Sequence, residues 1–256
     1  MAGSDELSCL KRRAEGSVGR ARGDWRQRRE GVRYVAPALR ASRNGVDALI
    51  LFEDRMDAAG QLAEALAHLR GTRPLVLAIP RGAVPMAALV AQKLQGDLDL
   101  VLVRKLHAPG APEFAIGAVD EAGWVYLAPH ASAVGATAAY IAEEKAAQMQ
   151  ELRRRRQLYT PGRSAPEVTG RTVIVVDDGL ATGATMVAAL HAVRQRGPAK
   201  LVCAVPVASE ESIKLVRQHA DEVVCPNVPR RFSAVGQFYR TFPQLEDEEV
   251  IRLLRA

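Results

Sequence analysis

Residues 177–185, Asp-Asp-Gly-Leu-Ala-Thr-Gly-Ala-Thr, form the stretch with the clearest chemical pattern in this sequence. They follow the apolar run 172–176, which is typical of a buried parallel strand, and precede a segment of helical composition. The free N–H groups of a helix's first turn bind anions, and Gly183 lets the main chain approach one closely. The hydroxyls of Thr182 and Thr185 are further donors. We therefore expect a monophosphate at this turn.

The two acids at the start of this loop point to the rest of the ligand. Asp177 and Asp178 would repel a phosphate unless they face something else. Carboxylates accept hydrogen bonds from ribose hydroxyls and bind hydrated Mg²⁺. One strand, turn and helix would thus hold a ribose 5-phosphate with its metal ion. The competing nucleotide motifs, Gly-x-x-x-x-Gly-Lys-Ser/Thr and a Gly-x-Gly-x-x-Gly after a strand, are absent from the sequence.

The elements that must position this loop alternate between strand and helix. Apolar runs bounded by turn residues predict strands at 74–79, 98–103, 172–176, 201–205 and 222–225. Helices are predicted at 62–69, from 83 to about 94, at 136–159, 183–196 and 210–219. Residues 114–119 and 124–127 read as a hairpin. This alternation predicts an α/β fold with a central, mostly parallel sheet and helices on both faces.

Two further strand ends carry basic residues. Pro-Arg-Gly at 80–82 follows one strand, and Arg104 and Lys105 follow another. In an open α/β sheet, ligands bind beyond the carboxyl ends of the strands. We therefore expect Arg81, Arg104 and Lys105 to lie near a ligand, the alternative for each being a solvated charge at a strand end.

This combination resembles the type I phosphoribosyltransferase family over roughly residues 50–256. Residues 173–185 are similar to its motif for phosphoribosyl pyrophosphate (PRPP). Residues 79–83 occupy the place of its pyrophosphate loop, and 103–113 resemble the start of its mobile catalytic loop. The resemblance is strongest to bacterial members whose acceptor is unsettled. It implies a small C-terminal hood over the acceptor, at about residues 226–243.

The resemblance implies Mg²⁺-dependent transfer of a phosphoribosyl group from PRPP to a small-molecule acceptor, with release of pyrophosphate. A nucleobase acceptor is a guess from the habits of the fold. The implied catalytic residues are Arg104, Lys105, Asp177 and Asp178. The implied substrate-binding residues are Arg81, Gly82, Asp177, Asp178, Gly179, Ala181, Thr182, Gly183, Ala184 and Thr185. Asp177 and Asp178 would also bind the metal, indirectly, together with PRPP.

The sequence departs from the family's pattern at two positions. Many members have Gly or Lys in place of Ala184, but Ala keeps the main-chain N–H, so phosphate binding should survive. Purine-type members have an acid in place of Ala181, and its absence puts the purine salvage reaction in doubt. Glu113 is the nearest candidate for a general base by sequence, although an ordinary loop carboxylate is the simpler interpretation. A planar acceptor stacked on Phe232 or Tyr239 is the alternative to packing within the hood.

The basic charge lies at the beginning of the chain. Residues 1–48 hold 11 Lys and Arg against 6 Asp and Glu, so they contribute +5 of the net +6. We predict a flexible basic extension over 1–48 and a phosphoribosyltransferase domain over 49–256. Because the domain is nearly neutral, we do not expect it to bind nucleic acid. Its one basic cluster, Arg153–Arg156, reads as a solvated helix face, with a partner subunit or RNA as alternatives; a homodimer is left open.

The composition limits the expected cellular location of the protein. No stretch approaches the length of a membrane span, and the beginning lacks an apolar signal core. The three cysteines show no metal-ligand spacing, so free thiols in the cytoplasm are expected. Two other function classes are compatible with the loop at 177–185. One is a PRPP-sensing regulator that binds nucleic acid, and the other is a hydrolase acting on a ribose phosphate.

Overall fold

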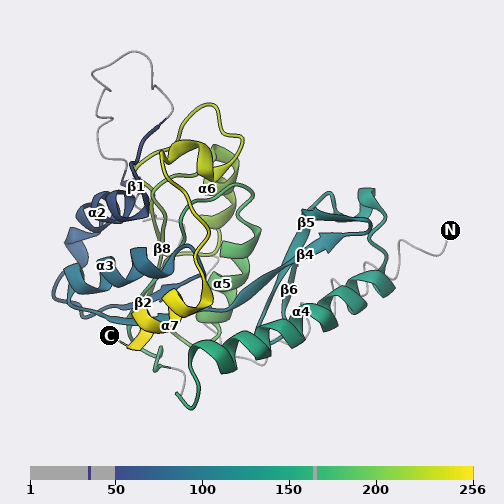
Figure 1. Ribbon diagram of the computed structural model, residues 1–256, viewed down its shortest axis with the longest axis horizontal. Helices are drawn as coiled ribbons and strands as arrows, with labels where there is room; N and C mark the ends of the chain where they lie inside the picture. Colours follow the sequence, from purple (N-terminus) through teal and green to yellow (C-terminus); the bar gives the residue numbers. More distant parts are fainter. Residues whose placement is uncertain (1–33, 36–49, 164–165, 256) are drawn as a thin grey trace.

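The computed structural model describes residues 34–35, 50–163 and 166–255, and it has two parts (Figure 1). The first is a body built on a parallel sheet. The second is an arm, made of three antiparallel strands and one long helix, which extends away from the body. The predicted extension over 1–48 lies outside the described residues, apart from Tyr34–Val35. Those two residues form β1, a short strand on one edge of the sheet.

The sheet of the body contains six strands in the order β1-β9-β8-β7-β2-β3. Every neighbouring pair is parallel, which confirms the predicted α/β class. The remaining strands are β2 Leu75–Ala78, β3 Asp97–Leu100, β7 Thr172–Val176, β8 Lys200–Ala204 and β9 Glu222–Val224. Their carboxyl ends meet at one edge, where the predicted site residues follow β2 and β7.

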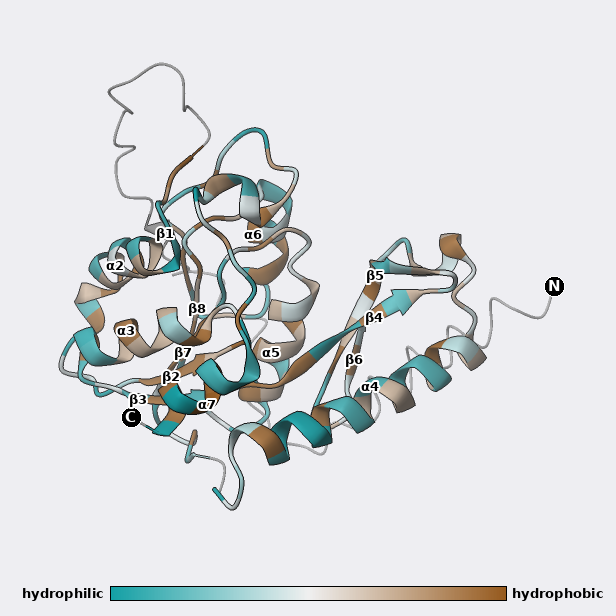
Figure 2. Cartoon of the chain, viewed as in Figure 1, coloured by the Kyte–Doolittle hydropathy of each residue, from teal (hydrophilic) through white to brown (hydrophobic). Residues whose placement is uncertain are grey.

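Alternate residues of each strand pack on opposite faces of this sheet. Val76 and Ile174 join one buried cluster, whereas Leu75 and Val173 join another. The first cluster is covered by α2 Arg55–Ala65, α3 Val84–Leu94 and α7 Asp247–Arg255. The second is covered by α5 Ala184–Arg194 and α6 Glu210–Val216. Figure 2 shows the strands of the body as the most hydrophobic part of the chain, as expected for a sheet covered on both faces.

The arm consists of β4 Val103–Ala108, β5 Ala111–Asp120, β6 Val125–Leu127 and α4 Ala138–Tyr159. The predicted hairpin and long helix are confirmed. The strand predicted at 98–103 is instead divided, because the chain leaves the parallel sheet after Leu100 and enters the arm at Val103. Leu102 and Val103 are buried like their predecessors, so hydrophobicity does not mark this change of partner.

The predicted hood, residues 226–243, is anchored to the first residues of the body. The main-chain N–H groups of Leu51 and Phe52 both donate to the Phe238 carbonyl, and Arg240 N–H donates to the Phe52 carbonyl. The hood contains one 3₁₀ turn, η4 Val235–Phe238, whose last residue is buried. The hood is therefore fixed on the same side of the body as α2. None of the helices in the described residues is long and apolar enough to cross a membrane.

Candidate active site

The loop of residues 177–185, hereafter the acid loop, lies beside the loop of residues 80–83. Ala78 pairs with Val176 at the ends of β2 and β7, and Ile79 N–H donates to the Val176 carbonyl. The two loops touch directly, since a Cβ atom on Gly82 would overlap Asp178 Oδ2. Glycine is thus required at position 82 for this approach. The structure brings together the two strand ends that the sequence singled out.

The end of the acid loop presents the amino terminus of α5. Gly183 is the N-cap residue, with φ of +77°, and no side chain caps the first turn. The N–H groups of Ala184 and its successors are therefore available to an anion. Thr182 is exposed and Thr185 half-buried, so both hydroxyls are accessible beside this turn. A Cβ on Gly183 would lie 3.3 Å from Ser212 Cβ, which shows how closely α6 supports the turn from behind.

The two acids at the start of the loop are held by the protein at one oxygen each. Asp178 N–H donates to Asp177 Oδ1 over 2.9 Å, and Arg55 engages Asp178 Oδ2. In the part of the chain that the structure describes, the other two carboxylate oxygens accept no hydrogen bond. Burial, followed by repulsion from Asp178, raises the pKa of Asp177 well above its usual value. Burial also raises the pKa of Asp178, against the opposing effect of Arg55.

Arg55 is a site residue that sequence reasoning missed. It is the first residue of α2, and its side chain is only 10% exposed. Its Nε and Nη2 atoms donate to Asp178 Oδ2 over 3.1 and 2.9 Å, and Nη1 donates to the Pro243 carbonyl over 2.6 Å. The one local signal is Asp54, whose carboxylate caps α2 and marks where the helix begins. Nothing in the sequence indicates a contact across 123 positions.

Lys105 and Arg104 point to opposite sides of β4, as successive residues of a strand do. Lys105 is exposed, and its positive charge lowers the pKa of both Asp177 and Asp178. Arg104 instead donates to Gln148 on α4 over 2.9 Å. Burial and the neighbouring Arg155 lower the pKa of Arg104. Arg104 is thus engaged with α4, whereas a role for Lys105 at the predicted site stays a prediction.

Arg81 lies between the loop of residues 80–83 and the beginning of α7. Its Nη1 atom is 3.5 Å from Asp247 Oδ1 and 3.8 Å from Glu246 Oε2. Asp247 also accepts a hydrogen bond of 2.6 Å from the Tyr159 hydroxyl. Burial and this bond raise the pKa of Tyr159 to about 12. A role for Arg81 in binding diphosphate stays a prediction, which requires it to leave these carboxylates.

Three further side chains, two of them aromatic residues of the hood, have partners within the protein. His107 bonds Glu144 through its ring Nδ1 and its main-chain N–H, at 2.8 and 3.1 Å. Tyr239 is buried and packs against Phe52 and Phe242, with ring centroids 5.0 and 4.7 Å apart, so it cannot stack on an acceptor. Phe232 is half-buried against Phe238.

The basic cluster on α4 is largely engaged in ion pairs. Arg154 and Arg155 both contact Glu151, and the bonds from them lower the pKa of Glu151 to about 2. Arg156 contacts Glu121. Arg153 and Arg154 are exposed, whereas Arg155 and Arg156 are half-buried, so the solvated helix face expected from the sequence applies to the first two residues.

The donor set suits Mg²⁺ bound together with a phosphorylated ligand. No group of three His, Cys, Asp or Glu side chains that could hold a metal occurs within the described ranges. Mg²⁺ typically keeps several waters and takes one or two carboxylates plus substrate phosphates. Asp177 and Asp178 each offer one unbonded oxygen, which fits that pattern. Ca²⁺ or Zn²⁺ would require more protein ligands.

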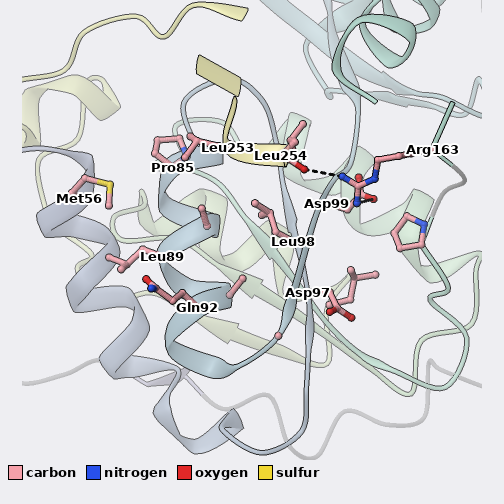
Figure 3. Close-up of a pocket in the computed structure, with 15 residues that line it drawn as sticks. Met56, Pro85, Leu89, Gln92, Asp97, Leu98, Asp99, Arg163, Leu253 and Leu254 are labelled. Carbon is pink, nitrogen blue, oxygen red and sulfur yellow. Dashed lines mark hydrogen bonds and ion pairs between the residues drawn. The ribbon is translucent and has the colours of Figure 1, made fainter. Parts of the chain in front are cut away.

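A separate cavity of about 820 Å³ lies between α3, β3 and α7 (Figure 3). Its lining is mainly apolar, including Leu89, Leu98 and Leu253. At one end, Arg163 bridges the Leu254 carbonyl and the buried Asp99 carboxylate. None of the predicted site residues lines it. The cavity is thus distinct from the acid loop.

Comparison with known proteins gives consistent matches. The sequence pattern of the phosphoribosyl transferase domain matches residues 50–241. Two Mycobacterium tuberculosis proteins, from strains CDC 1551 and H37Rv, are provisionally named phosphoribosyl transferases. Each is 44% identical over 207 residues, which cover 80% of this chain and 46% of the relative. The chain thus spans about half the length of these curated relatives. The crystal structure of TT1426 from Thermus thermophilus is 47% identical, with a TM-score of 0.67, covering 80% of this chain and 98% of that one.

Proposed function

Because the chain belongs to the phosphoribosyl transferase domain family, we propose that it transfers a phosphoribosyl group from PRPP to a small-molecule acceptor and releases pyrophosphate. The observation that carries the proposal is the contact between Gly82 and Asp178 of the acid loop. It supports a site in which the uncapped first turn of α5, the two carboxylates and the loop that contains Arg81 act on one ligand.

Each part of this edge has a task in the proposed reaction. The first turn of α5 with Thr182 and Thr185 binds the 5-phosphate, and the free oxygens of Asp177 and Asp178 accept from the ribose hydroxyls. The same two carboxylates would hold Mg²⁺ jointly with PRPP, and the metal supplies charge neutralisation to the diphosphate. The carbon–oxygen bond to the diphosphate breaks as the acceptor's bond to the anomeric carbon forms.

Lys105 and Arg81 are proposed to stabilise the leaving diphosphate. Displacement places positive charge on the ribose and negative charge on the leaving group, so fixed charges lower the barrier. Lys105 lies on β4, a strand of the extended arm, and its positive charge acts on both Asp177 and Asp178. A small movement of the arm would close it over bound diphosphate.

The acceptor lies beneath the hood in this proposal. Ala181, at the position of the acid that purine-type members use, is exposed and offers no proton acceptor. Phe232 and Phe242 are the hood aromatics that keep accessible surface, since Phe238 and Tyr239 are buried. A planar acceptor that needs no carboxylate at position 181 is therefore favoured over a 6-oxopurine.

The decisive experiment measures products formed from PRPP with Mg²⁺ and a panel of purine, pyrimidine and other planar bases. Pyrophosphate release together with a new glycosidic product demonstrates transfer. Pyrophosphate with free ribose 5-phosphate, independent of any base, would identify a hydrolase instead. Calorimetric titration with Mg²⁺ and PRPP tests the shared premise. Absence of binding to the full chain, or unchanged binding to a folded Asp177→Asn/Asp178→Asn variant, would overturn the proposal.

A further inference from the structure

Arg55 connects three segments that are far apart in the sequence. Two of its nitrogens donate to Asp178 Oδ2 in the acid loop, and the third donates to the Pro243 carbonyl at the end of the hood. Its guanidinium also lies 3.8 Å above the ring centroid of Phe242. A Cβ on Gly82 would come within 3.1 Å of Arg55 Nη2, so the loop of residues 80–83 packs on the same group.

The shape of the arginine side chain explains why this residue type is used. Its planar fork can donate to a carboxylate on one side and to a carbonyl on another while it stacks on an aromatic face. A lysine ammonium has no such plane, and it could satisfy only one of the two acceptors well. The main chain beneath Arg55 is also fixed, because Asp54 caps the first turn of α2 by accepting from Met56 and Asp57 N–H groups.

Burial of this ion pair calls for a reason other than stability. Moving two charges out of water costs free energy, and the attraction between them only roughly offsets that cost. Apolar residues at these positions would therefore give a fold of similar stability. The pair does fix the orientation of Asp178, whose carbonyl is held in addition by the Tyr239 hydroxyl at 2.7 Å. Arg55 occupies one carboxylate oxygen, and the other accepts no hydrogen bond among the residues that the structure describes.

On the basis of the proposed function, we propose that Arg55 is a positioning residue for phosphoribosyl transfer. It fixes the Asp178 carboxylate against the ribose of PRPP, and it joins the acid loop to the hood that covers the acceptor. Arg55 does not itself touch the substrate. Its effect on PRPP should therefore depend on the presence of the Asp178 carboxylate, and it should link PRPP binding to order in the hood.

A double-mutant cycle tests the first part. The dissociation constant for PRPP with Mg²⁺ is measured by calorimetry for the full chain, Arg55→Lys, Asp178→Asn and the double variant. Arg55→Lys should weaken binding about tenfold, the value of one charge-assisted hydrogen bond. In the Asp178→Asn background the same change should cost less than about threefold, because the residue that Arg55 positions is already lost. Equal losses in both backgrounds would show a general structural role and overturn the inference.

The second part is tested by hydrogen exchange of residues 238–243 with and without Mg²⁺ and PRPP. Binding should protect this segment in the full chain and fail to protect it in Arg55→Lys. Arg240→Lys is the matched control, since Arg240 bonds Glu53 in the same hood contact rather than Asp178, and it should behave like the full chain.

A replacement variant and a binding control separate failure of the Arg55 inference from failure of the proposed function. If Arg55→Lys does not fold, Phe242→Leu replaces it in the cycle, since it removes the aromatic face behind the guanidinium and leaves the hydrogen bonds. The expected loss of PRPP affinity is then smaller, and it should again decrease in the Asp178→Asn background. If the full chain does not bind PRPP with Mg²⁺, the proposed function fails. If it binds and the cycle is additive, only the role of Arg55 fails.

Discussion

The Tyr239 hydroxyl donates a hydrogen bond of 2.7 Å to the main-chain carbonyl of Asp178. Burial, and then the negative charge of Asp178, raise the pKa of Tyr239, so the hydroxyl stays protonated and acts as a donor. Tyr239 therefore supports the acid loop from the hood and is not a surface for the acceptor. Through this bond, the position of the two acids depends on a segment that lies 61 positions further along the chain.

Asp177→Asn should stabilise the protein without ligand and abolish its response to ligand. Burial and the charge of Asp178 raise the pKa of Asp177, so its ionisation lowers the stability of the folded state. This cost begins as pH rises through the unfolded pKa and is complete above the raised folded pKa. Asn removes it, so we expect the free energy of unfolding to rise by about 1 kcal/mol. Urea denaturation with and without PRPP and Mg²⁺ measures both effects. A less stable variant would mean that Asp177 serves the fold.

Lys105→Ala should lower turnover more than PRPP affinity, because the arm would close over the diphosphate only as charge develops there. Arg104→Gln is the comparison on the same strand, and it removes a side chain that bonds Gln148 on α4. We expect it to lower stability and leave kcat nearly unchanged. Steady-state kinetics of both variants, with the acceptor identified by the product screen, decide the matter. If Arg104→Gln removes turnover and Lys105→Ala does not, the orientation of β4 described above is wrong.

Gly82→Ala should displace the Asp178 carboxylate, because the added methyl group would overlap its Oδ2 atom. Overpacking of this kind costs about 1–3 kcal/mol of stability, and PRPP affinity should fall with it. Gly60→Ala is the matched control: no atom lies within 4 Å of its Cβ, and it lies inside α2, where Ala is favoured by up to about 1 kcal/mol. Thermal unfolding should shift in opposite directions for the two variants, and calorimetry should show weaker PRPP binding for Gly82→Ala but not for Gly60→Ala.

Lowering the pH should weaken the contact between α4 and β4, because it protonates Glu144. Burial acts to raise the pKa of Glu144, but bonds from the main chain and ring of His107 and from Gln148 outweigh it, so the pKa is lowered. Its stabilising contribution is therefore complete above its unfolded pKa and is lost as pH falls through the lowered folded value. Glu144→Gln should produce the same loosening at neutral pH, by about 1–2 kcal/mol.

Hydrogen exchange of residues 103–108 at neutral and acidic pH measures this effect. Glu143→Gln, on the exposed side of the same helix, should leave exchange unchanged at neutral pH. Faster exchange in both variants would point to a general effect on α4 rather than to the bond with His107.

Deletion of residues 1–48 should leave PRPP binding intact and remove weak, salt-sensitive binding to nucleic acid. The segment carries +5 of the net +6, and binding through such charge falls steeply as salt rises. It also removes Tyr34–Val35, a two-residue edge strand, so a small loss of stability is expected. Filter binding of RNA and DNA across salt concentrations, with and without PRPP, is the measurement. PRPP-responsive binding retained by the truncated protein at physiological salt would favour the regulator class.

The local pattern of the sequence determined the strands, the order of helices and the two strand ends that meet at the site. Apolar runs such as 172–176 and turn residues such as Gly183 act over a few positions, where backbone geometry and burial leave few alternatives. The same local reasoning failed at Leu100, since burial alone does not say whether the next residue pairs with a parallel or an antiparallel neighbour. It also treated Arg104 and Lys105 alike, although they face opposite sides of β4.

Contacts between residues that are far apart in the sequence became evident only in the tertiary structure. Arg55 lies before the helix predicted over 62–69, and nothing in the sequence marks it, because its partners Asp178 and Pro243 lie 123 and 188 positions away. For Tyr239 the sequence left stacking on an acceptor as the alternative to packing within the hood, and the structure shows packing against Phe52 and a bond to the acid loop. Residue type and spacing thus fixed which groups can do chemistry, whereas packing of distant segments fixed which way each group points and which of its atoms are left to bind a ligand.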